Sequence, residues 1–178
     1  MLKILAICGS LRKDSTNMGL IRYAMQSCKD INIEIADLSQ IPFYNSDIQD
    51  KPLSVLTLLK QMEQAHGFIF ACPEYNYSLA PALKNALDWA SREKDNYLLS
   101  GKAAGIIGAG GGMGTSRAQY HLRQVCVFLD IHVLNKPEVF SNAFDGSFDA
   151  GGNLLNEKIK QNIDNQLLEL KKLINKVE

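Results

Sequence analysis

The chain has 178 residues, 46% of them hydrophobic, and its 19 Lys and Arg residues match its 19 Asp and Glu residues in number. This length predicts a single domain over residues 1–178, large enough for a sizeable core. The zero formal net charge argues against a nucleic-acid-binding surface, which would show an excess of basic residues. No apolar run approaches the roughly 20 residues of a membrane span, so we expect neither nucleic acid nor a membrane span.

Apolar runs and helical spacings alternate along the chain. Strands are predicted at residues 2–8, 32–38, 67–72 and 103–109, with a broken fifth strand at 131–134 and 139–140. Helices are predicted after the first strand and at residues 53–65, 81–92, 115–129 and 154–177. Residues 39–52 have the composition of a loop. This alternation predicts a three-layer α/β sandwich, a parallel sheet with helices on both faces.

The loop after the first strand, G-S-L-R-K-D-S-T-N at residues 9–17, has the features of an anion site. Gly9 permits a tight turn. Three residues typical of helix N-caps end the loop: Ser15, Thr16 and Asn17. Free N–H groups and the positive end of the helix dipole would face the anion. Arg12 would add the one guanidinium group of this loop. A short loop of this kind suits one phosphate monoester, and the alternative is an ordinary capped helix without a ligand.

The loop after the third predicted strand, P-E-Y-N-Y-S at residues 73–78, is polar and aromatic. In open α/β sheets ligands bind at the carboxyl ends of the strands, and Tyr, Asn and Ser side chains there can grip a flat polar heterocycle. Two roles are open for Glu74: it holds the loop by bonding backbone N–H groups, or it touches the ligand. A mononucleotide at the carboxyl ends of five parallel strands predicts the flavodoxin-like order 2-1-3-4-5.

Residues 108–114, G-A-G-G-G-M-G, follow the fourth predicted strand. They do not fit the dinucleotide fingerprint G-x-G-x-x-G, because Met113 stands where a glycine is needed and the run follows a late strand. No G-x-x-x-x-G-K-[ST] motif occurs either. Bare backbone here would let a flat ring approach closely, with N–H groups facing its carbonyl oxygens. The alternative is a flexible loop without a ligand.

Four segments in this order, spread over nearly the whole chain, resemble the NADPH-dependent FMN reductase family, which includes bacterial quinone, azo and chromate reductases. They are G-S-L-R-K-D-S-T-N (9–17), P-E-Y-N-Y-S (73–78), L-K-N-A-L-D-W-A-S-R (83–92) and R-A-Q-Y-H-L-R-Q-V (117–125). Two features depart from the family pattern. Ala82 stands where the family usually has glycine, and the glycines at 110–112 stand where relatives often carry Ser or Thr. The second departure leaves open whether side chains there contact the flavin ring.

The resemblance implies a bound FMN, with NADPH or NADH as cosubstrate. The positions that it assigns to the cofactor are Gly9, Ser10, Leu11, Arg12, Ser15, Thr16, Asn17, Pro73, Glu74, Tyr75, Asn76, Tyr77, Gly110 and Gly111. It also implies two-electron, ping-pong reduction of quinones or similar small-molecule acceptors, such as azo or nitro compounds, chromate or free flavin. No side chain is expected to act as a catalyst, because N5 of the flavin would carry the hydride.

Two other functional classes stay open at this point. A flavodoxin-like electron carrier would bind FMN and pass single electrons to a protein partner. Such carriers tend to be strongly acidic, which steers a basic partner, whereas this chain is neutral. A flavin-binding regulatory module without turnover is the other class. A hydrolase with Ser10 or Ser15 as nucleophile is disfavoured, because no G-x-S-x-G elbow accompanies either serine.

A homodimer or homotetramer is expected, as in the resembling family. The loop and helix after the third strand place four apolar residues close together: Tyr77, Leu79, Leu83 and Trp89. Leu83 can face the sheet, but the helix cannot turn Trp89 and the loop residues inward as well. An exposed patch of this kind usually marks a subunit contact, most often with two-fold symmetry. The loop at 39–52, with Phe43 and Tyr44, could cover the neighbouring subunit's flavin.

The four cysteines lie far apart, without a C-x-x-C pair: Cys8, Cys28, Cys72 and Cys126. They are expected to be reduced thiols of a cytoplasmic protein. The N-terminus agrees with this location, because it enters a strand without a signal-peptide pattern. The three histidines have no spacing suited to a metal ion, so no metal site is expected.

Overall fold

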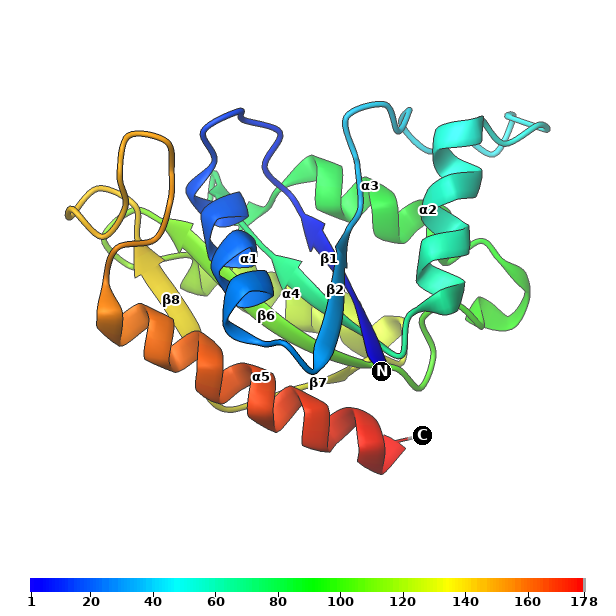
Figure 1. The fold of residues 1–178 in the computed structure, drawn as a ribbon. Coiled ribbons are helices and arrows are strands. Elements are labelled where there is room, and N and C mark those ends of the chain that lie inside the picture. The colour runs from blue at the N-terminus through cyan, green and yellow to red at the C-terminus, as the bar shows by residue number, and fades with distance from the viewer. Residues whose placement is uncertain (178) are drawn as a thin grey trace.

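The computed structural model describes residues 1–177 and contains one main sheet with the order β2-β1-β3-β6-β7 (Figure 1). Its strands are β1 (Leu2–Cys8), β2 (Ile31–Ile35), β3 (Gly67–Ala71), β6 (Ala103–Gly110), β7 (His132–Val133) and β8 (Val139–Asn142). Every strand pair in this sheet is parallel. Both β7 and β8 pair with β6, one at each end of it, so together they form the broken fifth strand. The predicted order 2-1-3-4-5 is confirmed.

Within the described part of the chain, five α-helices cover the sheet, α1 and α5 on one face and α2, α3 and α4 on the other (Figure 1). Their bounds are α1 (Thr16–Ser27), α2 (Leu53–Gln64), α3 (Pro81–Ala90), α4 (Ser116–Phe128) and α5 (Glu157–Val177). A short 3-10 helix, η1 (Lys94–Asn96), follows α3. The central strand β3 is buried throughout, as expected for a parallel sheet covered on both faces. Of the helices in residues 1–177, none combines the length and apolar character needed to cross a membrane.

Two predicted boundaries differ from the structure by three residues, and the others by at most two. The strand β2 ends at Ile35 and not at residue 38. The chain turns beyond it, because the carboxylate of Asp37 accepts a hydrogen bond from the N–H of Ser39 at 2.9 Å. Helix α5 begins at Glu157 and not at residue 154. There Oδ1 of Asn156 accepts bonds from two N–H groups of the first turn and so caps the helix.

The side chain of Trp89 is buried, with only 2% of its surface exposed, so the expectation that it lies on an exposed patch is wrong. The loop at residues 39–52 supplies the cover. The indole N–H of Trp89 donates to the carbonyl oxygen of Pro42 at 2.8 Å, and the side-chain amide of Asn85 donates to the same oxygen at 2.9 Å. The ring of Tyr44 meets the indole edge-on. Tyr44 is thereby held against its own chain, whereas Phe43 in the same loop is exposed.

We expect Trp89→Phe to lower the free energy of unfolding by about 2 kcal/mol, since it removes one of the two donors to the carbonyl of Pro42 and part of a buried ring. Urea denaturation followed by far-ultraviolet circular dichroism measures this quantity. Phe43→Ala is the control from the covering loop. Its effect should stay within about 0.5 kcal/mol, because that ring is exposed. Equal losses in the two variants would contradict the burial of Trp89.

Candidate functional site

The three loops singled out in the sequence lie together at the carboxyl edge of the sheet (Figure 1). The strands β1, β3 and β6 are parallel neighbours, so the loops that follow them leave the same edge. The N–H of Gly9 donates to the carbonyl of Ala71 at 2.9 Å. The N–H of Cys72 donates to the carbonyl of Ile107 at 2.8 Å. These bonds bring together the starts of the predicted site segments: 9–17, 73–77 and 110–111.

Gly9 is needed for a close approach between the first two loops. A Cβ at this position would lie 3.0 Å from both Cδ of Pro73 and Cβ of Ala80, which stand at the two ends of the loop after β3. A larger residue would push the loops apart. The glycine therefore lets the first loop rest directly on the second.

The loop at 9–17 runs into the N-terminus of α1, as predicted. Ser15 is the N-cap residue, and its hydroxyl accepts the N–H of Met18 at 3.2 Å. Arg12 is exposed and takes part in none of the ion pairs among residues 1–177. The side chain of Asn17 has a structural partner: its amide accepts the N–H of Ala109 at 3.0 Å and donates to the carbonyl of Ala109 at 2.9 Å. The side-chain amide is therefore engaged within the chain.

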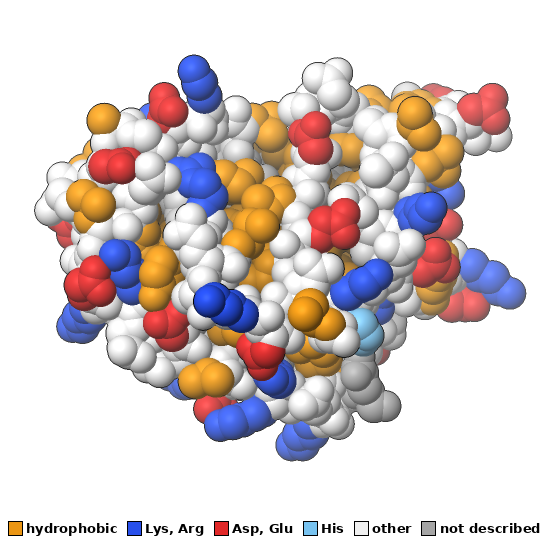
Figure 2. Space-filling model, viewed as in Figure 1, with side chains coloured by type: hydrophobic (Ala, Val, Ile, Leu, Met, Phe, Trp, Pro, Cys, Tyr) orange, Lys and Arg blue, Asp and Glu red, His pale blue; other side chains and the backbone are white. Residues whose placement is uncertain are grey.

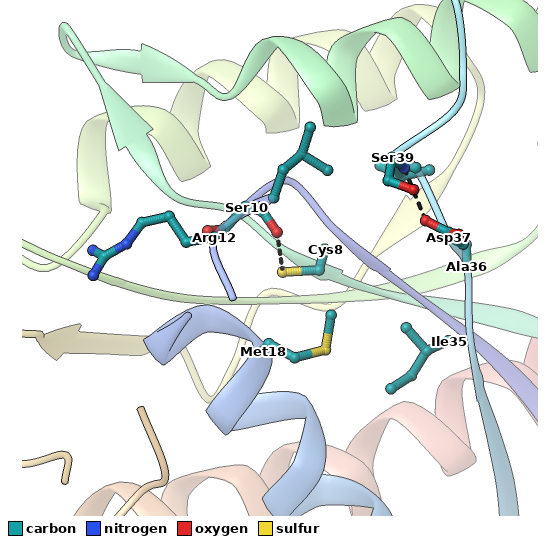
Figure 3. Close-up of a pocket in the computed structure, with 10 residues that line it drawn as sticks. Cys8, Ser10, Arg12, Met18, Ile35, Ala36, Asp37 and Ser39 are labelled. Carbon is teal, nitrogen blue, oxygen red and sulfur yellow. Dashed lines mark hydrogen bonds between the residues drawn. The ribbon is translucent and has the colours of Figure 1, made fainter. Parts of the chain in front are cut away.

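A cavity of about 310 Å³ opens on the β2 side of this loop. Its walls are mostly apolar, with Met18 and Ile35 among them, and Figure 2 shows apolar side chains between α1 and the end of β2. Figure 3 shows Asp37 and Ser39 on one side of the cavity, whereas Arg12 extends away from them. Hydrogen bonds from the backbone and hydroxyl of Ser39 hold the pKa of Asp37 below its usual range. The ionised carboxylate repels phosphate, so an anion is better placed on the Arg12 side of the loop.

Cys8 lines the same cavity from below the loop (Figure 3). Its thiol donates to the carbonyl of Ser10 at 3.6 Å, and burial raises its pKa. The thiol therefore stays protonated at neutral pH and is no nucleophile. Its observed contact is the one to the turn at Ser10.

Residues 74–79 form a hairpin, β4 (Glu74–Tyr75) and β5 (Ser78–Leu79), which the sequence pattern did not predict. Its turn residues Asn76 and Tyr77 have φ angles of 50° and 65°. The left-handed region costs a non-glycine residue roughly 1–2 kcal/mol. The guanidinium of Arg117 lies 3.9 Å from the centroid of the Tyr77 ring, and such a cation–π contact offsets part of that cost. Strain of this kind clusters at ligand sites.

The carboxylate of Glu74 holds the hairpin against α4. Its Oε1 pairs with Arg117 at 2.8 Å, and its Oε2 accepts the N–H of Ala118 at 3.2 Å. Only 10% of the side chain is exposed. Both oxygens thus bond to groups at the start of α4. Of the two roles open for Glu74, the structure favours bonding to the backbone over contact with a ligand.

The glycine run after β6 forms a tight turn, in which the N–H of Gly114 donates to the carbonyl of Gly111 at 2.8 Å. A Cβ on Gly110 would lie 2.5 Å from the carbonyl oxygen of Gly114, so the turn itself requires this glycine. Gly111 and Gly112, in contrast, are exposed, and no atom lies within 4 Å of the place a Cβ would take. They leave open surface where a flat ring can approach the backbone.

Arg117 is the site residue that sequence reasoning missed. Besides its contacts to Glu74 and Tyr77, its second terminal nitrogen lies 2.9 Å from Sδ of Met113, at the tip of the glycine turn. One side chain therefore joins the hairpin to the glycine turn and fixes the width of the space between them. In the sequence, Arg117 could be noticed as an arginine at the second position of the helix after the glycine run. Its pairing with Glu74 could not be predicted, because the two residues lie 43 positions apart.

Known proteins resemble this chain over nearly its whole length. The model of the family described as NADPH-dependent FMN reductase matches residues 2–146. An NAD(P)H:quinone oxidoreductase from Solanum tuberosum is 46% identical over 187 residues, which cover 100% of this chain and 95% of that protein. An NAD(P)H-dependent FMN reductase from Pseudomonas aeruginosa is 47% identical over 173 residues, which cover 95% of this chain and 93% of that protein.

Among solved structures, the flavoenzyme FerB, an NAD(P)H:(acceptor) oxidoreductase from Paracoccus denitrificans, matches with a TM-score of 0.85 at 28% sequence identity. The match covers 97% of this chain and 98% of that protein. The flavodoxin-like fold and the family resemblance read from the sequence are both confirmed. The chain therefore belongs to the NADPH-dependent FMN reductase family, and it is an NAD(P)H-dependent oxidoreductase with FMN as its cofactor.

Proposed function

We propose that the protein passes two electrons from NADPH or NADH to quinones or similar acceptors, with FMN bound at the carboxyl edge of the sheet. The observation that carries this proposal is the meeting of three loops. An exposed arginine beside a helix N-terminus, a rigid hairpin and an open glycine turn lie next to one another. Relatives named as quinone oxidoreductases, 46% and 44% identical to this chain, support quinones as acceptors.

The residues of the first loop fit a mononucleotide phosphate. Arg12 is an exposed cation beside the N-terminus of α1, where the first-turn N–H groups have no acceptor within the helix. These groups and the helix dipole favour an anion. The residues that we assign to the phosphate end are Gly9, Ser10, Leu11, Arg12, Ser15, Thr16 and Asn17. Asn17 would contribute its backbone N–H, because its amide is bonded to Ala109.

The hairpin and the glycine turn fit the flavin ring and ribityl chain. Tyr75, Asn76 and Tyr77 stand at the exposed tip of the hairpin, and we assign them to one border of the ring. Gly111 offers bare, exposed backbone on the other border, held in its turn by Gly110. Pro73 and Glu74 would act by holding the hairpin in place.

FMN, when bound, supplies the hydride chemistry of the reaction. The residues of the chain bind and orient: the first loop holds the phosphate end, and Arg117 fixes the hairpin relative to the glycine turn. The exposed glycines leave one side of this space open, where NAD(P)H and the acceptor would bind one after the other. We assign no side chain as acid or base. A shared place for both substrates implies ping-pong kinetics.

The flavodoxin-like electron carrier is the alternative function considered for the sequence. A zero formal net charge gives no strong field with which to steer a charged protein partner. The relatives are named as NAD(P)H-dependent enzymes. Both observations favour turnover with small acceptors over single-electron transfer to a protein.

We propose a cytoplasmic location for the protein. All four cysteines are free thiols, and three of them are buried. Burial raises the pKa of Cys72 and Cys126 to about 12, so these thiols stay protonated. Free thiols without a disulfide partner suit a reducing compartment.

We propose that the chain forms a homodimer or homotetramer through the outer face of α4. Three large side chains on this helix are exposed: Tyr120, Val127 and Phe128. Val127 and Phe128 expose 81% and 79% of their surface, and the exposed Tyr77 lies against the start of the same helix through Arg117. An apolar strip of this kind usually marks a subunit contact, which two-fold pairing would bury in both copies. The strip replaces the patch around Trp89 expected from the sequence.

Arg12→Ala should weaken FMN binding by about 1.5–3 kcal/mol, the range of a lost hydrogen bond to a charged group. Flavin fluorescence titration of the apoprotein measures the dissociation constant. Lys13→Ala removes the same charge from the next position and is the control, with less than half of that effect expected. Activity of Arg12→Ala should largely return at excess FMN, because the arginine holds phosphate and takes no part in the chemistry. A variant with wild-type FMN affinity would refute the assignment.

With FMN bound, initial rates of NADPH oxidation at several fixed concentrations of a benzoquinone should give parallel lines in double-reciprocal plots. Parallel lines follow from two substrates that use one place in turn. Intersecting lines would indicate a ternary complex and count against the shared place. Binding of FMN without turnover of NADPH or NADH by any quinone would refute the proposed reaction itself.

Phe128→Glu should lower the molar mass measured by light scattering at micromolar concentration, because a buried unpaired charge is strongly unfavourable. Leu168→Glu is the control. Leu168 is also an exposed apolar residue, but it lies on α5, on the opposite face of the sheet, so this change should leave the molar mass unaltered. A wild-type protein that is a fully active, FMN-loaded monomer at this concentration would overturn the proposed assembly.

A further inference from the structure

The start of α1 is held from two sides by segments that are distant in the sequence. On one side, the amide of Asn17 bonds to both backbone groups of Ala109 in β6. On the other side, residues 149–153, in the connection between β8 and α5, pass along the first turns of α1 (Figure 1). We call these five residues the clasp. The first turn of α1 is thereby set between β6 and the clasp.

The clasp touches α1 backbone to backbone. A Cβ on Gly152 would lie 2.8 Å from the carbonyl oxygen of Asp14 and 2.9 Å from the carbonyl carbon of Ser15. A Cβ on Gly19 would lie 1.8 Å from the carbonyl oxygen of Gly152. Gly152 also has a φ of 74°, in the left-handed region that favours glycine. No side chain fits between the two segments, so their separation is set by the backbone itself.

Arg22 fastens this contact. Its Nε donates to Oδ1 of Asn153 at 3.0 Å, and a terminal nitrogen donates to the carbonyl of Gly151 at 3.1 Å. The clasp is also braced within itself, because the carboxylate of Asp149 accepts the backbone N–H and the side-chain amide of Asn153 at 2.8 and 2.9 Å. The guanidinium of Arg22 is thus engaged with the clasp, in contrast to the exposed side chain of Arg12.

We infer that Arg22 and the contact between Gly19 and Gly152 position the N-terminus of α1 for the phosphate group of FMN. The inference rests on the phosphate site proposed above. Several N–H groups and Arg12 must converge on one small anion, and groups that are already held in place bind it with less loss of conformational freedom. Within residues 1–177, the side-chain hydrogen bonds of the clasp join it to itself and to α1. These bonds reach the proposed site through α1, so we expect the clasp to act on the phosphate end of the cofactor.

FMN and riboflavin separate phosphate recognition from general folding, because they share the ring and the ribityl chain and differ only by the phosphate. Fluorescence titration of the apoprotein gives both dissociation constants. Arg22→Ala should raise the dissociation constant of FMN roughly tenfold and leave that of riboflavin within about twofold. Arg123→Ala is the matched control. Arg123 likewise bonds to an asparagine Oδ1, that of Asn135, and to a backbone carbonyl, that of Leu134. None of these three residues belongs to the site loops, so neither constant should change.

Arg22→Lys separates position from charge, because lysine keeps the positive charge and loses the planar fork. The dissociation constant of FMN should still rise, by about threefold or more. A wild-type value for Arg22→Lys would show that only the charge matters, and it would overturn the inference.

Two alanine variants test the backbone contact without a change in charge. Gly152→Ala places a Cβ against Asp14 and Ser15. Gly146→Ala is the control, because Gly146 also has a positive φ, 84°, but no atom lies within 4 Å of the new Cβ. Both variants carry the same kind of backbone strain, so the difference between them isolates the contact. Only Gly152→Ala should raise the dissociation constant of FMN, with that of riboflavin unchanged.

Two results would overturn the inference and leave the phosphate site standing. The first is an equal loss of affinity for FMN and riboflavin in Arg22→Ala and Gly152→Ala, which would indicate a general structural role. The second is unchanged affinity for both flavins. A wild-type protein that binds FMN no more tightly than riboflavin would instead refute the proposed phosphate site, and the inference with it.

Discussion

The two hydrogen bonds between the amide of Asn17 and the backbone of Ala109 are the constraint on which the functional edge of this protein depends. The strand β3 stops pairing with β6 at the level of Ile107, where the N–H of Cys72 meets the carbonyl of Ile107. The backbone N–H and carbonyl of Ala109, two residues further along β6, would therefore have no hydrogen-bond partner on the side of β3. The amide of Asn17 takes the place that the next residue of β3 would have filled. Each such buried backbone group left without a partner would cost about 1–3 kcal/mol.

Because the side chain of Asn17 replaces a residue of β3 as the partner of Ala109, the chain after β3 can take another path. It leaves the sheet at Cys72 and forms the hairpin, while the backbone groups of Ala109 near the end of β6 keep their hydrogen-bond partners. The same two bonds draw the N-terminus of α1 toward the glycine turn. The loop proposed for the phosphate and the glycine turn proposed for the flavin ring thus become neighbours, although they are separated by almost 100 positions in the sequence. Arg117 completes the arrangement from the far side by linking the hairpin to the turn.

The order of the sheet could be predicted from the sequence, because short apolar runs followed by helical spacings are typical of parallel strands buried on both faces. The first two site loops were visible as polar residues after such runs. The burial of Trp89 could not be predicted from helical periodicity, because the loop that covers it lies 47 residues away in the sequence. The partners of Asn17 and Glu74 lie 92 and 44 residues away. The residue types of Asn17 and Glu74 and their places in the loops predicted that both lie near the site. The role of each side chain depends on its hydrogen-bond partner, which the sequence does not reveal. The assignment of single residues to FMN stays a prediction.

The open positions at Gly111 and Gly112 make this enzyme adaptable. Neither residue has a positive φ, and no neighbour lies within 4 Å of where a Cβ would stand, so both can accept side chains without strain or collision. Gly110 and Gly114 in the same run cannot, because a Cβ on either would lie within 3 Å of other backbone or side-chain atoms. Mutation can therefore change the side chains at these two adjacent positions while the fold stays intact. With the flavin ring bordering this turn, as proposed, such changes would alter the space offered to the acceptor without weakening the fold.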